Sequence, residues 1–66
     1  SERIKAGMDE LDVLIKDIGE ISACREMRKR FCAYSKGLAG GPALRSLIVQ
    51  AQTASDYKTI FSSYLL

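Results

Sequence analysis

The sequence contains no histidine, and this absence excludes several classes of function at once. Structural zinc sites draw on sets of cysteine and histidine ligands in paired spacings, whereas this chain offers only two cysteines, Cys24 and Cys32. Without an imidazole, no side chain titrates by default near neutral pH, and Ser–His or Cys–His nucleophile pairs cannot form. We therefore expect no metal site, no catalytic residue and no cofactor-binding residue within these 66 residues.

Long apolar runs are also missing from the chain. No stretch approaches the ~18 apolar residues that a membrane span needs, and residues 1–7 lack the basic-then-apolar layout of a signal peptide. Cys24 and Cys32 are eight residues apart on one predicted helix, about 12 Å along its axis, which is too far for a disulfide between them. They indicate free thiols in a reduced, cytoplasmic monomer, with an intermolecular disulfide as the alternative.

The distribution of charge says more about partners than the net charge of +2 does. Residues 1–20 carry six acidic and three basic side chains, whereas residues 21–45 carry six basic and one acidic. A basic segment that is separated from the acids in this way favours an anionic partner.

Apolar spacing predicts an all-α fold, a small four-helix bundle with helices at about 3–18, 20–36, 42–51 and 54–65. The expected buried seams are Ile4, Met8, Leu11, Leu14, Ile15 and Ile18; Ile21, Cys24, Met27, Phe31, Tyr34 and Leu38; Leu44, Leu47, Ile48 and Ala51; and Tyr57, Ile60, Phe61, Tyr64 and Leu65. Gly19 is expected to end the first helix, and Gly37 to end the second as a left-handed C-cap. Pro42 fits the first turn of the third helix, and Thr53 with Asp56 fits a capping box that opens the fourth.

Two features could bind an anion. The first is a stripe of cations on the second helix, Arg25, Arg28, Lys29 and Lys36, joined by Arg30 and Arg45, where each cation can meet a phosphate; the alternative is a solvated face. The second is the N-terminus of the third helix behind Gly40 and Gly41, where free amides could bind a phosphate; the alternative is a plain inter-helix turn. Tyr34 either stacks on a base or packs in the core.

Two other patterns carry less weight. Asp9 and Asp12 share one face, as a pair of acid–base carboxylates would, but a solvated polar face explains them as well. The glycines between Gly37 and Gly41 lack both the glycine-lysine-serine ending and the preceding strand of a phosphate-binding loop. Neither pattern indicates an enzyme within this chain.

The segment Arg28–Gly40, RKRFCAYSKGLAG, resembles the signature of the C-terminal helical domain of bacterial tRNA-dihydrouridine synthases, a group that includes proteins named as nitrogen-regulation homologues. That signature reads arginine-lysine-histidine, two variable residues, tryptophan-tyrosine, one variable residue, then lysine-glycine-leucine-proline-glycine. Alanine-leucine-arginine follows, as at residues 43–45, and later a threonine, as at Thr53. The resemblance spans about residues 8–65, and it departs at Arg30 (for histidine), Ala33 (for tryptophan) and Ala39 (for proline).

In that family an FMN-binding TIM barrel reduces a uridine of tRNA with NADPH, and the helical domain helps to hold the tRNA. The resemblance implies that residues 1–66 are a single helical domain of a longer oxidoreductase, a flavoprotein whose barrel lies outside this sequence. That family uses a cysteine of the barrel as general acid, and because the barrel lies outside this sequence, neither Cys24 nor Cys32 inherits this role. The implied partners are tRNA and the barrel itself, and the cations that match the family pattern are Arg28, Lys29, Lys36 and Arg45. Together with Arg25 and Arg30 from the cationic stripe, the expected RNA-binding residues are Arg25, Arg28, Lys29, Arg30, Lys36 and Arg45.

Two alternatives remain at this stage. The chain could be a protein–protein or inter-domain docking module without direct RNA contact, in which case an exposed apolar patch is expected. It could also be a basic regulator of transcription, which only the alternative family name suggests, since we see no helix-turn-helix spacing.

Overall fold

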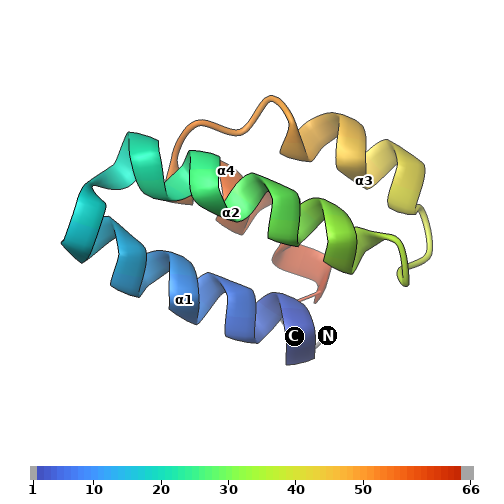
Figure 1. Cartoon of the computed structure of the whole chain (residues 1–66). Coiled ribbons are helices and arrows are strands. Elements are labelled where there is room, and N and C mark those ends of the chain that lie inside the picture. Colours follow the sequence, from blue (N-terminus) through green and yellow to red (C-terminus); the bar gives the residue numbers. More distant parts are fainter. Residues whose placement is uncertain (1, 65–66) are drawn as a thin grey trace.

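The structure, a computed structural model, describes residues 2–64, which form four α-helices and one short 3₁₀ turn (Figure 1). The elements are α1 (Glu2–Ile18), α2 (Glu20–Ser35), α3 (Gly41–Ile48), α4 (Ala54–Ile60) and η1 (Ser62–Tyr64). Residues 2–64 contain no strand, so the prediction of an all-helical chain is confirmed. No helix in this range is long and apolar enough to cross a membrane.

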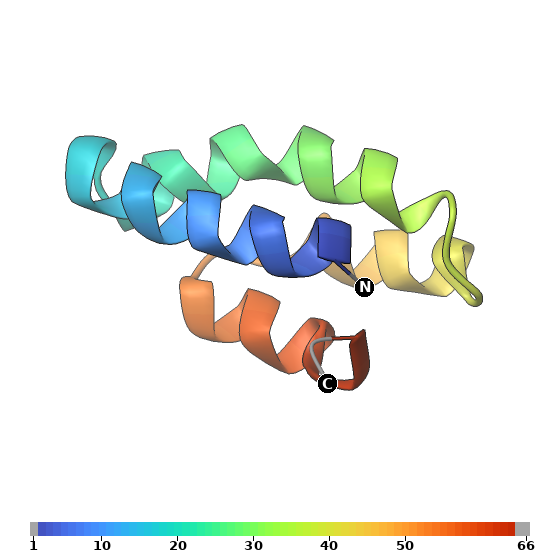
Figure 2. The same cartoon turned by 90° about the horizontal axis from the view of Figure 1, so that it is seen from below.

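The helices are arranged around α2. α1 and α2 run antiparallel as a hairpin, and α3 packs along the side of α2 that is turned away from α1 (Figure 1). α4 contacts both α1 and α3, and it covers the side of the core that is drawn lowest in Figure 2. One face of α2 therefore borders α1, and another borders α3 and the segment that leads from α3 to α4.

Gly19 joins the first two helices, as predicted. Its φ of 88° lies in the left-handed region, which a residue without a Cβ adopts at no steric cost. Its amide donates to the Ile15 carbonyl at 2.9 Å, and its own carbonyl accepts from the Ala23 amide at 2.9 Å. One residue thus ends α1 and begins α2.

The predicted left-handed C-cap at Gly37 is wrong. Among residues 2–64 only Gly19 and Gly40 have positive φ. The orphan carbonyls at the end of α2 are instead satisfied by a 3₁₀-type continuation, in which the Lys36, Gly37 and Leu38 amides each donate to the carbonyl three residues earlier. The left-handed residue comes later, at Gly40 (φ 74°), where the chain turns into α3.

The third and fourth helices are shorter than predicted. α3 ends at Ile48 rather than at residue 51, since the Gln50 and Ala51 amides switch to carbonyls three residues back and the chain then leaves the helix. α4 ends at Ile60, followed by a turn at Phe61 and by η1. The last two residues of the chain, including the predicted core residue Leu65, lie outside the described residues.

The capping box that opens α4 is confirmed. The Thr53 hydroxyl accepts from the Asp56 amide at 3.0 Å, and the Asp56 carboxylate accepts from the Thr53 amide at 3.2 Å. The same carboxylate also accepts from the Gln52 amide at 2.9 Å. These bonds fix the connection between α3 and α4 at the point where it enters α4.

The core is centred on Phe31. Its ring lies 4.6 Å from Tyr57, 4.9 Å from Phe61 and 6.4 Å from Tyr34, centroid to centroid. The buried Tyr57 hydroxyl donates to the Cys24 carbonyl at 3.0 Å, which ties α4 to α2. Tyr34 packs against the core and is only half-buried.

Three predicted seam residues are exposed rather than buried: Ile18 (42%), Ile21 (71%) and Leu47 (51%). Ile18 and Ile21 flank the α1–α2 turn, which projects beyond α3 and α4 (Figures 1 and 2), so nothing covers it. The periodicity of the two helices was correct, but their hairpin is longer than the elements that pack on it.

Both cysteines have free thiols, as predicted, with Cys24 buried and Cys32 half-buried. Burial raises the pKa of the Cys24 thiol, and the carboxylates of Glu20 and Asp56 add to this effect against the opposing charge of Arg28. Cys24 is therefore an inert core thiol, and Cys32 is the more accessible of the two.

Candidate nucleic-acid interface

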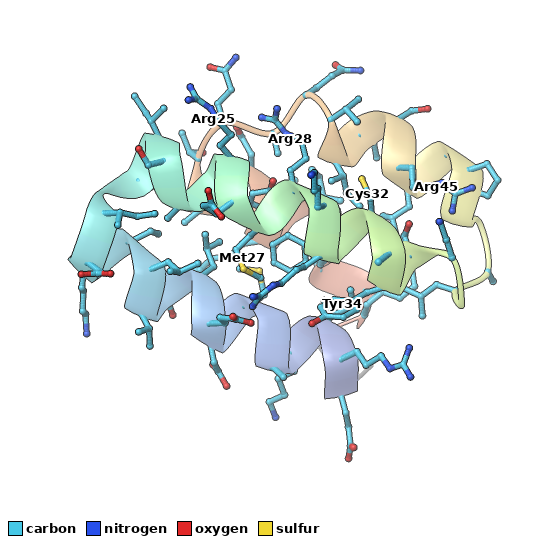
Figure 3. The ribbon with its side chains drawn as sticks, viewed as in Figure 1. Arg25, Met27, Arg28, Cys32, Tyr34 and Arg45 are labelled. Atoms are coloured by element: carbon cyan, nitrogen blue, oxygen red, sulfur yellow. The ribbon has the colours of Figure 1, made fainter. Side chains whose placement is uncertain are left out.

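A groove runs along α2 where this helix faces the end of α3. It has a volume of about 480 Å³ and is lined by Arg25, Arg28, Lys29, Cys32, Ala33, Lys36 and Val49. Six of these residues recur at three- and four-residue steps, five on α2 and the sixth, Lys36, directly after its last residue, which places them on one face of a helix. Figure 3 shows Arg25, Arg28 and Cys32 on the side of α2 toward α3, whereas Met27 and Tyr34 lie on the side of α1.

The lining of the groove combines four cations with three uncharged residues, and we call these three its floor. Arg25, Lys29 and Lys36 are exposed, and none of them makes an ion pair with another residue in the range 2–64. No carboxylate among these residues lines the groove. Its floor is made by Cys32 and Ala33 from α2 and by Val49, which follows α3 and is 55% exposed.

Arg28 is held more firmly than the other cations. It is half-buried, and its Nη2 donates to the Ala51 carbonyl at 3.2 Å, across 23 residues of sequence. Its Nε is buried and makes no hydrogen bond within residues 2–64. Burial raises the pKa of the neighbouring Tyr57 hydroxyl, and the positive charge of Arg28 opposes that rise. Arg28 thus connects the groove to the core and to the segment after α3.

A second hollow adjoins the groove toward the start of α2. It measures about 310 Å³ and is lined by Ile21, Cys24, Arg25, Arg28 and Gln52. Arg25 and Arg28 line both hollows. The two hollows thus adjoin at Arg25 and Arg28, and we call the pair of hollows the trough along α2.

The two remaining predicted cations lie elsewhere. Arg30 points toward α1 and forms an ion pair with Glu10, both side chains being about half exposed, so the pair adds little to stability. Arg45 on α3 donates to the Ser35 hydroxyl at 3.5 Å. The structure thus brings Arg25, Arg28, Lys29 and Lys36 together, and it places Arg30 and Arg45 outside the groove.

The N-terminus of α3 is arranged as an inter-helix turn. The Gly41 amide already donates to the Leu38 carbonyl at 3.1 Å. A Cβ on Gly41 would lie 2.5 Å from the Ser35 carbonyl oxygen. The close backbone approach that the paired glycines permit is therefore an approach to α2, and the Gly41 amide is already bonded within the turn.

Sequence reasoning missed the far wall of the trough. Val49 and Gln52 contribute to it from the segment between α3 and α4. An apolar residue just beyond a helix end carries no local signal for such a role, because only the packing of α3 beside α2 brings it there. In the part of the chain that the structure describes, no three cysteine or acidic side chains gather as a metal site would require.

No protein-family model and no solved structure matches the chain. A comparison with curated proteins gives a significant match to a protein of Treponema pallidum (strain Nichols) named "Probable tRNA-dihydrouridine synthase". The two are 37% identical over 59 residues, which cover 89% of this chain. The chain spans only 17% of the length of that relative.

This similarity supports a relationship to enzymes that act on RNA. More particularly, it supports the tRNA-dihydrouridine synthase family, which the Arg28–Gly40 segment also resembles.

Proposed function

We propose that this chain is the tRNA-contacting helical domain of a tRNA-dihydrouridine synthase, and that it holds RNA phosphates along α2. The larger protein would be a cytoplasmic FMN- and NADPH-dependent oxidoreductase whose catalytic barrel carries the chemistry and packs on this domain. The observation that carries the proposal is the groove with Arg25, Arg28, Lys29 and Lys36 at its edges. Arg30 and Arg45 would contact the RNA backbone only at the margins of this site.

Electrostatics within α2 support a role in binding. Arg25 and Lys29 are one helical turn apart, a spacing at which like charges destabilise a helix by about 0.2–0.5 kcal/mol. Neither side chain has an acidic partner among residues 2–64. A phosphate between them would relieve this repulsion and release counterions, so affinity for RNA should fall as salt is added.

The experiment reverses two of the charges. We expect Arg25→Glu with Lys29→Glu to abolish binding of unmodified tRNA, measured by fluorescence anisotropy at low salt. Arg28 is left intact, because its hydrogen bond to Ala51 would confuse loss of binding with loss of fold.

The matched control is Arg3→Glu with Lys58→Glu. It makes the same change in net charge at two exposed positions that do not line the groove. Unchanged tRNA affinity in the Arg25/Lys29 variant, or an equal loss in the control, would refute phosphate contact at this face.

A second candidate function is docking onto another protein domain. The observation in its favour is the exposure of Val13 (67%), Ile18 and Ile21 near the α1–α2 turn. Association through such residues would not weaken with salt, whereas RNA binding would. The salt series on the unmodified chain therefore separates the two.

A further inference from the structure

The groove on α2 has more than a row of cations. Phosphate contact needs only charge, yet between the cations lies an apolar floor of Cys32, Ala33 and Val49. The volume of about 480 Å³ falls within the roughly 300–1,000 Å³ of ordinary small-molecule sites. A surface that met only the outside of a duplex would leave this floor uncovered.

We infer that the groove takes an unpaired nucleotide, with its base on the floor of Cys32, Ala33 and Val49 and its flanking phosphates against Arg25, Lys29 and Lys36. The inference rests on the proposed function and specifies its ligand as single-stranded or bulged RNA rather than a regular duplex. In a duplex the bases are stacked inside and cannot reach such a floor, whereas unpaired bases can be splayed out and stacked on side chains.

Arg28 suits this ligand. Unpaired bases stack on the planes of arginine side chains as well as on aromatic rings. The bond from Nη2 to the Ala51 carbonyl holds the Arg28 guanidinium at the edge of the groove, so little rotamer freedom remains to be lost on binding. Arg25, which lines both hollows with it, adds a second plane at the point where the next nucleotide would follow.

Ala33 allows the floor to be tested without touching a charge. It is exposed on α2, and leucine is a good helix former, so Ala33→Leu should fold and narrow the groove. We would compare a short single-stranded oligouridylate with a blunt RNA duplex of the same length. The unmodified chain should bind the oligouridylate more tightly, and Ala33→Leu should weaken that binding about tenfold while leaving duplex binding unchanged.

The control is Ala6→Leu, which makes the same change at an exposed position on α1 outside the groove, and should alter neither affinity.

Cys32 gives an independent readout. Because Cys24 is only 1% exposed, a maleimide should react chiefly at Cys32. Oligouridylate should slow that reaction, and the duplex should not.

The outcomes separate the two proposals. Equal binding of both RNAs, unaffected by Ala33→Leu, would overturn the nucleotide site but leave phosphate contact standing. If neither the oligouridylate nor the duplex bound at low salt, both proposals would be overturned. Protection of Cys32 by an acidic, leucine-containing peptide but not by oligouridylate would overturn the nucleotide site in favour of a protein partner.

Discussion

At the scale of single residues, Gly41 shows how closely the third helix approaches the second. A Cβ at this position would stand 2.5 Å from the Ser35 carbonyl oxygen and 3.1 Å from an Arg45 nitrogen. The arginine can move, but the carbonyl belongs to the last turn of α2 and cannot. We expect Gly41→Ala to destabilise the fold by about 1–3 kcal/mol, as overpacking in a core does, measured by urea denaturation.

The control for this prediction is Gly37→Ala. There the nearest atom to a new Cβ is 4.0 Å away and φ is not positive, so the substitution should be tolerated. If both variants were equally stable, α3 would not approach α2 as closely as the structure indicates.

At the scale of elements, α4 depends on carboxylates at its N-terminus. The Asp56 carboxylate accepts from the Gln52 and Thr53 amides, and the Glu20 carboxylate accepts from the Ala54 amide at 3.3 Å. Negative charge is favourable at this end of a helix dipole. The short α4 is thus held by charge as well as by its packing.

This arrangement makes stability depend on pH. The hydrogen bond from the Gln52 amide is the largest cause that lowers the pKa of Asp56 below its ordinary value of 3.8. Desolvation opposes it, and the hydrogen bonds from the Thr53 amide and hydroxyl add to the lowering. The folded-state pKa of Asp56 is lower than its ordinary value of 3.8. The contribution of Asp56 to stability is therefore complete above the ordinary value, and it is lost as the pH falls through the folded-state pKa.

We expect Asp56→Asn to lower the thermal unfolding midpoint at neutral pH and to flatten its decline below pH ~4. Circular dichroism melts across that range would check the prediction. A variant whose acid decline ran parallel to that of the unmodified chain would show that other carboxylates are responsible.

At the scale of the whole molecule, stability depends on a few aromatic contacts. A chain of 66 residues has a free energy of unfolding of about 3–10 kcal/mol, and phenylalanine-to-alanine changes in a core cost about 3–5 kcal/mol. Phe31 contacts rings from α2, α4 and the turn after α4. We therefore expect Phe31→Ala to lose most of its cooperative unfolding transition.

The comparison for this variant is Ile21→Ala. Ile21 is 71% exposed, so its loss should change the free energy of unfolding by no more than about 0.5 kcal/mol. Comparable destabilisation by the two changes would mean that the end of the hairpin is covered, as it would be in a self-associated form.

Much of this architecture could be predicted from local pattern. Helical periodicity identified the four helices, and the chemistry of Gly19, Thr53 and Asp56 located three of their ends, because each of these signals acts within a few residues. Exposure at Ile18 and Ile21 could not be predicted, since it depends on the length of the elements that pack on the hairpin. The same limit applied at Gly37, where a 3₁₀-type end removed the need for a left-handed residue.

Part of the candidate site could also be predicted from local pattern, and part depends on tertiary packing. A helical projection groups Arg25, Lys29 and Lys36 on one side of a helix without further information. The tie from Arg28 to Ala51 and the wall made by Val49 and Gln52 depend on how α3 returns along α2, which no local pattern encodes. That these side chains bind RNA stays a prediction.

The tie between Arg28 and Ala51 has a mechanical consequence. The Arg28 guanidinium donates to Ala51 in the connection between α3 and α4, and Arg28 also lines the groove that we propose binds RNA. A phosphate that pulled the Arg28 side chain away from Ala51 would break the hydrogen bond to the α3–α4 connection. A phosphate that bound Arg28 without moving it would leave that bond intact. In the proposed complex, RNA binding and the packing of the α3–α4 connection on α2 would both depend on Arg28, so a substitution there should affect both.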